Sequence, residues 1–221
     1  MKFKKFLLLS GMLLFAILPQ LHAHTIDYQF ANMSNTDIGW TYLQYGFTHI
    51  VPLGLDHILF VLCIFLFNSK IKSVLWQATA FTIAHSITLG LAMYGWIEPL
   101  PSVIEPIIAL SIFFVAVENL MVKDLKPARI MIIFAFGLVH GMGFAGALID
   151  LGLPQTDYFL ALLTFNVGVE LGQIAVISIA YFGFSKWFRD KSWYYPYFVK
   201  PVSICIALIG LFWTIERSFF T

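Results

Sequence analysis

Histidine and acidic residues interrupt the long apolar runs of this sequence at widely spaced positions. A charged side chain at the centre of a membrane helix costs roughly 2.5 to 3.5 kcal/mol on insertion scales, so groups of such residues indicate functional sites. Imidazole and carboxylate together form a ligand set suited to zinc, nickel, copper or iron. We therefore predict a metal site formed by residues that converge from several helices: His49, Asp56, His57, His85, His140 and Glu170.

A second set of polar residues lies where it could orient these ligands or extend a path away from them. A histidine that binds a metal through one ring nitrogen needs a partner for the other. Asn166, Glu170 and Gln173 are spaced i, i+4 and i+7, which places them on one face of a helix. Hydrogen bonding of the histidines to neighbouring helices is the alternative to a metal site. The residues expected in the supporting role are His24, Ser86, Glu118, Asn119, Asn166 and Gln173.

The composition indicates an integral membrane protein. Of the 221 residues, 60% are hydrophobic and 11% are charged, against roughly 45–50% and 25% in a soluble globular domain. No stretch is long and polar enough to form a separate soluble domain, so a single membrane domain is expected. The expected partners are the lipid bilayer and a metal ion, nucleic acid is not expected, and assembly into a homo-oligomer is left open.

The first 23 residues have the pattern of a cleavable signal peptide (1–23). Lysines at positions 2, 4 and 5 precede an apolar run from Phe6 to Pro19, which is short for a membrane span, and Ala23 offers a cleavage point. An uncleaved first helix is the alternative, because Leu21 is not the small residue usually found two positions before the cleavage residue. Cleavage would leave His24 at the mature N-terminus, where its imidazole and the free amine could capture a metal ion.

Residues 24–48 are mixed in character and predict a short external segment that ends in an interfacial helix. Six apolar runs follow, which we compare with the roughly 30 Å of hydrocarbon that a membrane helix must cross. The first is short as a helix, so we expect the region around Pro52 and Gly54 to dip into the membrane and complete it. The expected fold is an all-α membrane domain over residues 24–221, with spans near 53–68, 74–94, 104–123, 130–150, 159–184 and 199–216.

Basic residues set the expected orientation of the chain. The first, third and fifth connections between the spans carry the lysines and arginines, whereas the opposite side has only Arg217. By the positive-inside rule these three connections are cytoplasmic. The mature N-terminus and the C-terminus are then both outside, which agrees with the signal peptide.

Two segments of the chain are similar to each other. Residues 113–118 (FFVAVE) match residues 165–170 (FNVGVE) at five positions when Ala and Gly are counted as equivalent, and a Phe-x-x-x-His motif precedes each. The pattern predicts a parallel repeat of two helices, as in some transporters, with chance similarity as the alternative. Glycines spaced i, i+4 bracket both His140 and Glu170, which predicts close helix packing around them.

Three functions are compatible with these residues. A permease would pass a metal ion through the His/Asp/Glu site, and protonatable ligands of this kind can release it again. An intramembrane zinc-dependent hydrolase would use three histidines, Asp56 and Ser86 to hold zinc and an activated water. An accessory protein would bind the ion without conducting it. We expect a transporter rather than an enzyme, and the sequence has no P-loop motif that would indicate ATP hydrolysis.

The order of these motifs resembles that of the HupE/UreJ family of small membrane proteins, which are associated with hydrogenase and urease accessory functions and regarded as nickel permeases. The resemblance implies inward movement of a divalent metal ion across a bacterial inner membrane, with nickel first and cobalt, zinc or copper as alternatives. The family's signal peptide and about six spans are matched as well. The resemblance rests on five motifs: HIVPLGLDH (49–57), AHSITL (84–89), EN (118–119), GLVHGMGFA (137–145) and FNVGVELGQ (165–173).

Overall fold

Helices account for most of the structure, and no strand occurs among the residues that it describes. The computed structural model describes residues 33–67, 70–122, 127–150 and 157–220. The predicted signal peptide and His24 lie outside these residues. The all-α prediction is confirmed by helices α3 (Asn35–Ile50), α4 (Leu55–Phe67), α5 (Ile71–Met93), α6 (Pro101–Met121), α7 (Pro127–Asp150), α8 (Tyr158–Ala180), α9 (Lys186–Phe188) and α10 (Lys200–Phe219).

The long helices follow the predicted apolar runs. Five of them, α5, α6, α7, α8 and α10, are long and apolar enough to cross a membrane, and α8 continues through a π-helical turn, Tyr181–Ser185, into α9. The pair α3 and α4, which are bent by 68° relative to each other, is a sixth candidate when it is counted as one broken span. The predicted multi-pass fold with about six membrane helices is thereby confirmed.

Residues 24–48, which are predicted as a short external segment that ends in an interfacial helix, are described by the structure from residue 33 onward. Most of the described part of this segment is helix α3, which packs along α8 and buries Ile38, Tyr42 and Ile50. The helix begins after Ser34, whose hydroxyl accepts a hydrogen bond from the Asp37 backbone N–H at 3.3 Å. Polar and aromatic residues are mixed along α3 without a sustained apolar period, so its buried face was not evident from the sequence.

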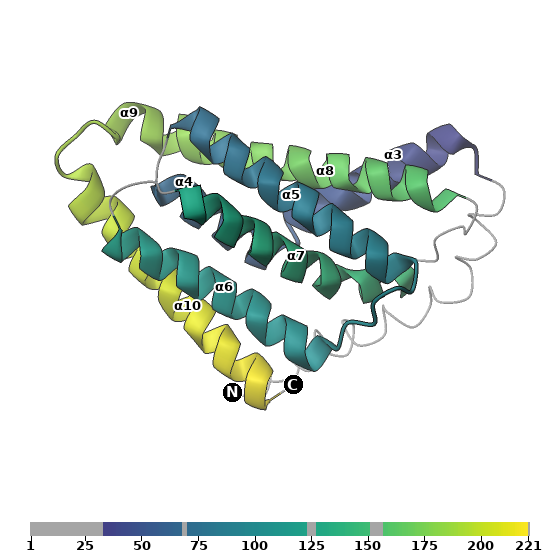
Figure 1. Ribbon diagram of the computed structural model, residues 1–221. Helices are drawn as coiled ribbons and strands as arrows, with labels where there is room; N and C mark the ends of the chain where they lie inside the picture. Colours follow the sequence, from purple (N-terminus) through teal and green to yellow (C-terminus); the bar gives the residue numbers. More distant parts are fainter. Residues whose placement is uncertain (1–32, 68–69, 123–126, 151–156, 221) are drawn as a thin grey trace, which may run out of the picture.

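Three pairs of helices build the bundle: α3 with α8, α5 with α7, and α6 with α10 (Figure 1). Helix α4 contacts α3, α5, α6, α8 and α10 and is therefore the central element. The first turn of α4 passes from an exposed residue, Leu55, to a buried one, His57.

Glycines allow each pair of helices to approach closely. A Cβ atom on Gly168 would collide with the backbone of α3 at Leu43, and one on Gly141 would collide with the His85 carbonyl of α5. In the third pair, Gly210 lies against the backbone of α6 in the same way. The close packing predicted around His140 and Glu170 is therefore confirmed, and it draws α7 and α8 toward their partner helices.

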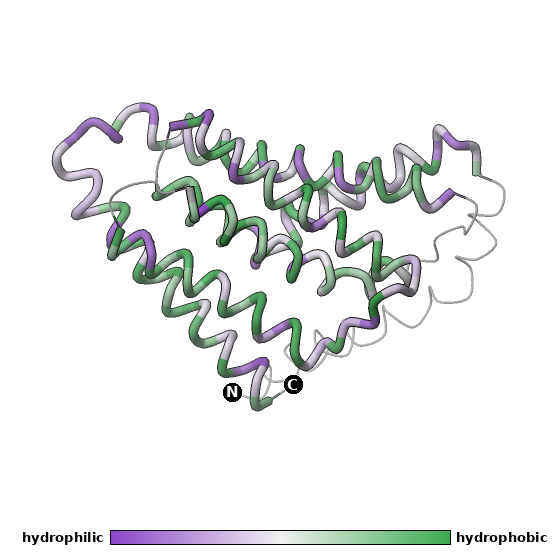
Figure 2. The backbone as a smooth tube through the Cα atoms, viewed as in Figure 1, coloured by the Kyte–Doolittle hydropathy of each residue, from purple (hydrophilic) through white to green (hydrophobic). Residues whose placement is uncertain are grey.

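The outer surface of the bundle is hydrophobic, as a surface in contact with lipid must be. Hydrophobic residues extend along most of the long helices, whereas hydrophilic residues gather at the connection between α9 and α10 (Figure 2). Large rings point outward from several helices, including Trp76, Phe182 and Phe212, which are each at least 60% exposed. The structure is thus that of a lipid-embedded bundle with polar residues in its interior.

Candidate metal site

The break between α3 and α4 brings two histidines together. His49 lies in the last turn of α3, and His57 lies in the first turn of α4. The residues between the helices include a cis peptide bond between Val51 and Pro52 and a glycine, Gly54, where a Cβ would collide with the His49 carbonyl. The two imidazole ring centroids are 4.6 Å apart.

His85, from the middle of α5, completes a group of three imidazoles. Its ring centroid lies 6.2 Å from that of His49 and 5.8 Å from that of His57. One ring nitrogen of each residue can be chosen so that all three atoms lie within 4.8 Å of one another. Small side-chain rotations would bring these nitrogens within bonding distance of a single ion, since metal–imidazole bonds are roughly 2.0–2.1 Å long.

A hydrogen bond determines which nitrogen of His85 is open. Its Nδ1 lies 3.4 Å from Oδ1 of Asn166, whose own Nδ2 donates to the Leu162 carbonyl at 2.7 Å. An amide oxygen can only accept, so Nδ1 of His85 carries the proton and Nε2 keeps its lone pair. The Nε2 atoms of His85, His49 and His57 are all buried and have no hydrogen-bond partner among the described residues. This donor set fits a divalent transition metal.

His140, from α7, lies beside this group and also has a defined tautomer. Its ring centroid is 5.0 Å from that of His57. The Ser111 hydroxyl donates its single proton to the Ile108 carbonyl at 2.7 Å, so it must accept from Nε2 of His140, which lies 2.9 Å away. The lone pair of His140 is therefore on Nδ1, which is buried and has no partner in the described part of the chain. His140 can thus share an ion with His57 or receive one from it.

Phenylalanine rings surround the imidazoles. The Phe81 ring centroid is 5.8 Å from that of His57, and the Phe60 ring centroid is 5.2 Å from that of His140. Both phenylalanines are buried. Charges interact more strongly in such surroundings than in water, so a cation in this position depends on its direct ligands for compensation.

A cavity of about 750 Å³ reaches the imidazoles from one end of the bundle. Three of the four histidines line it: His49, His57 and His140. Asp56, Glu105 and Arg217 line it as well. The Arg217 guanidinium binds the Asp56 carboxylate, with its Nη2 3.1 Å from Oδ1 and 3.2 Å from Oδ2. Asp56, which is predicted as a metal ligand, is therefore held by an arginine at the cavity.

Glu170 lies one turn beyond Asn166 on α8 and contacts α5 at a different level from His85. Its Oε1 accepts a hydrogen bond from the Thr79 hydroxyl at 2.7 Å, and its Oε2 is buried without a partner among the described residues. No carboxylate of the described residues falls within the same close spacing as the three imidazoles. Glu170 is therefore near the predicted site but does not share one ligand shell with the imidazoles.

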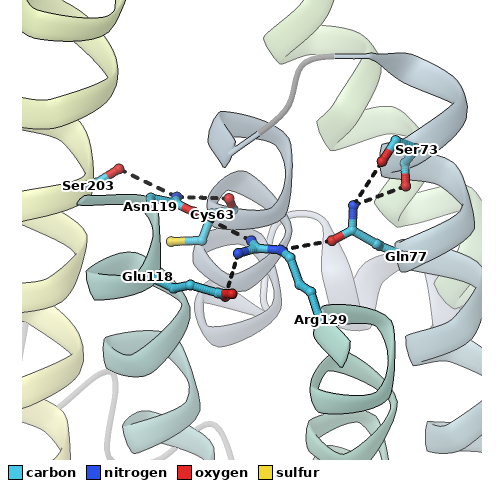
Figure 3. A network of polar contacts seen from close by, with 7 residues as sticks. All are labelled: Cys63, Ser73, Gln77, Glu118, Asn119, Arg129 and Ser203. Atoms are coloured by element: carbon cyan, nitrogen blue, oxygen red, sulfur yellow. Dashed lines mark hydrogen bonds and ion pairs between the residues drawn. The ribbon is translucent and has the colours of Figure 1, made fainter. Parts of the chain in front are cut away.

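A second polar network lies toward the opposite end of the bundle and centres on Arg129 (Figure 3). The guanidinium forms a salt bridge with Glu118 and lies 3.8 Å from the Phe67 ring centroid. It also donates hydrogen bonds to Oε1 of Gln77 at 3.0 Å and to Oδ1 of Asn119 at 3.4 Å. The sequence places Arg129 in a basic connection, yet it is only 1% exposed. These partners compensate for its desolvation. Glu118 and Asn119, expected beside the metal path, belong to this network.

The structure brings four of the six predicted ligands together and gives the other two different partners. The four histidines are adjacent, whereas Asp56 binds Arg217 and Glu170 binds Thr79. Of the supporting residues, Asn166 contacts His85, while Ser86 donates to the Thr82 carbonyl at 2.6 Å. No signal in the sequence predicts the contacts that three further polar residues make with the predicted ligands: Thr79, Ser111 and Arg217.

The comparison with models of protein families finds a match over most of the chain. The family model described as HupE / UreJ protein matches residues 25–217, a range that includes every described residue of the site. No match is found among curated proteins or solved structures. The family is generally linked to nickel or cobalt uptake or to accessory roles. Because the match covers most of the chain, this protein belongs to the HupE/UreJ family.

Proposed function

We propose that this protein is a permease that carries a divalent transition-metal ion, nickel first, inward across a bacterial inner membrane. The observation that supports this function is the group of three imidazoles whose Nε2 atoms are buried and have no partner among the described residues, beside a cavity of about 750 Å³. Imidazole is a suitable ligand for nickel, copper and zinc. An ion that entered the cavity would meet ring nitrogens without first breaking hydrogen bonds between protein groups.

The cavity end of the bundle is the expected outer end. Lys200 begins α10, whose other end carries Arg217 at the cavity, and the positive-inside rule assigns the end with Lys70, Lys186 and Lys200 to the cytoplasm. At the outer end the carboxylates of Asp56 and Glu105 would attract cations. Arg217 forms a salt bridge with Asp56, so an incoming divalent ion would compete with Arg217 for this carboxylate.

The two other functions receive different support from the site. An accessory protein would use the same imidazoles to bind an ion without moving it, and only a flux measurement separates it from a permease. The hydrolase function gains nothing from the geometry, because the Ser86 hydroxyl donates to the Thr82 carbonyl and Asp56 is bound to Arg217.

Reconstitution of the purified full chain into liposomes tests the permease function. Nickel is added outside, and a metal-sensitive dye trapped inside reports its arrival. We expect influx through the wild-type protein and a loss of at least about tenfold in His57→Ala and in His85→Ala, because each variant removes one ligand. Phe159→Ala is the control for loss of a ring, because this side chain is 75% exposed, and its influx is expected to match the wild type.

Each other outcome also discriminates between functions. A wild-type protein that binds nickel tightly but gives no influx would support the accessory role. A protein that neither binds nor transports the ion would contradict the metal site itself.

A further inference from the structure

We propose a second cation-binding station between α5 and α8, formed by Glu170, Gln173 and Thr79. Its ligands would be oxygen atoms only: a carboxylate, an amide carbonyl and a hydroxyl. The proposal rests on the permease function and adds a step to it, since this station would receive the ion from the imidazoles before its release.

The Glu170 carboxylate has one oxygen available for an ion. Its Oε1 accepts from the Thr79 hydroxyl at 2.7 Å, which orients the group toward α5. Its Oε2 is buried and has no hydrogen-bond partner in the described part of the chain. A carboxylate oxygen buried without a donor or a cation is costly, so a cation beside Oε2 would stabilise it.

Gln173 is the second unusual group on this face of α8. Its side chain is 0% exposed, and neither its Oε1 nor its Nε2 has a partner among the described residues. Gln77 of α5 is buried to the same extent but uses its amide fully, with bonds to Ser73 and Arg129. A buried polar group left unpaired costs roughly 1–3 kcal/mol, and a cation bound by the Gln173 carbonyl would offset part of this cost.

The station is continuous with the imidazole group through α8. Asn166 contacts Nδ1 of His85, Glu170 follows four residues later and Gln173 three residues after that, so all three lie on one helical face. At a rise of 1.5 Å per residue, Gln173 lies about 10 Å further along the helix than Asn166. Because α8 leads toward the basic end of the bundle, the station lies on the expected cytoplasmic side of the imidazoles.

The change of ligand type gives the station a role in release. Imidazole suits nickel, whereas carboxylate, carbonyl and hydroxyl oxygens suit harder ions such as manganese and magnesium. A nickel ion on oxygen ligands alone would therefore be held less tightly than one on three imidazoles. Transfer from nitrogen to oxygen ligands would let the ion leave toward the cytoplasm.

Manganese binding to the purified full chain tests the station directly, because Mn²⁺ prefers oxygen ligands. We expect electron paramagnetic resonance to show Mn²⁺ bound by the wild type and by His57→Ala. Glu170→Gln and Gln173→Leu should weaken this binding by about tenfold. Glu98→Gln removes an exposed carboxylate and serves as the matched control. Asp56→Asn separates binding at the station from binding in the cavity.

Manganese binding that is unchanged in both Glu170→Gln and Gln173→Leu would overturn the proposal. So would binding that disappears in Asp56→Asn, because the ion would then be in the cavity. Retained nickel binding at the imidazoles shows that each variant is folded, and loss of nickel binding in both α8 variants would mean that these residues belong to the imidazole site instead.

Nickel influx separates the station from the permease function. We expect Glu170→Gln and Gln173→Leu to reduce influx by about tenfold while nickel still binds to the imidazoles. Wild-type influx in both variants would overturn the station and leave the permease intact. A wild-type protein without influx would overturn the permease, and the manganese measurement would then decide on the station alone.

Discussion

Replacement of Asn166 tests whether the second ring nitrogen of His85 controls metal binding. Asn166→Leu removes the acceptor of the Nδ1 proton, so the proton can move to Nε2 and block the ligand position. The hydrogen bond is long, at 3.4 Å, which places the expected effect at the lower end of the range for such partners. We expect nickel affinity to fall by about tenfold, or about 1.4 kcal/mol.

Asn166→Asp is the matched variant, since its carboxylate also accepts from Nδ1 and forms a stronger, charge-assisted bond. Nickel affinity should then be retained or increased. Isothermal titration calorimetry measures both affinities, and ¹⁵N chemical shifts of the His85 ring report its tautomer. An Asn166→Leu protein that binds nickel as tightly as the wild type, with the proton still on Nδ1, would refute the reasoning.

Three further substitutions probe the elements that position the site. Gly54→Ala should abolish nickel binding without removing the protein from the membrane, because the new Cβ collides with the His49 carbonyl and displaces this histidine from His57; unchanged affinity in calorimetry would contradict this. Arg217→Gln should release Asp56 and lower the nickel concentration for half-maximal influx by up to about fivefold, since such partly exposed ion pairs contribute about 1 kcal/mol or less. A higher concentration for half-maximal influx would show that Arg217 assists nickel binding. Gly141→Ala should lower the thermal unfolding midpoint by about 2–10 °C through overpacking of α5 against α7. Gly146→Ala is the control and should leave the midpoint unchanged, because no atom lies within 4 Å of its new Cβ.

The membrane helices could be predicted from the sequence because their apolar runs are long and their ends carry charges. Helix α3 could not. Its buried face consists of Ile38, Tyr42, Gly46 and Ile50, and two of these are not strongly apolar. The close contact of Gly46 with the backbone of α8 at Phe165, which fixes this helix in the bundle, depends on a pairing that local sequence does not reveal.

The histidines could be predicted as a group because an ionisable residue in an apolar helix must face the interior. The partners of the acidic residues could not, because they lie far away in the sequence. Arg217 is 161 residues from Asp56, and Thr79 is 91 residues from Glu170. The sequence places Arg129 among the basic residues of a connection, but a salt bridge with Glu118 makes its burial possible.

The ligands of bound nickel provide the most direct measurement of the central claim. X-ray absorption spectroscopy of the purified protein with one equivalent of nickel should show imidazole nitrogens from His49, His57 and His85 and no sulfur. Sulfur is not expected because Cys63 is buried outside this group of imidazoles and Cys205 is exposed. His85→Ala should reduce the imidazole contribution by one ligand. A nickel spectrum without imidazole, or one that is unchanged when His57 and His85 are both replaced by alanine, would contradict the proposed site.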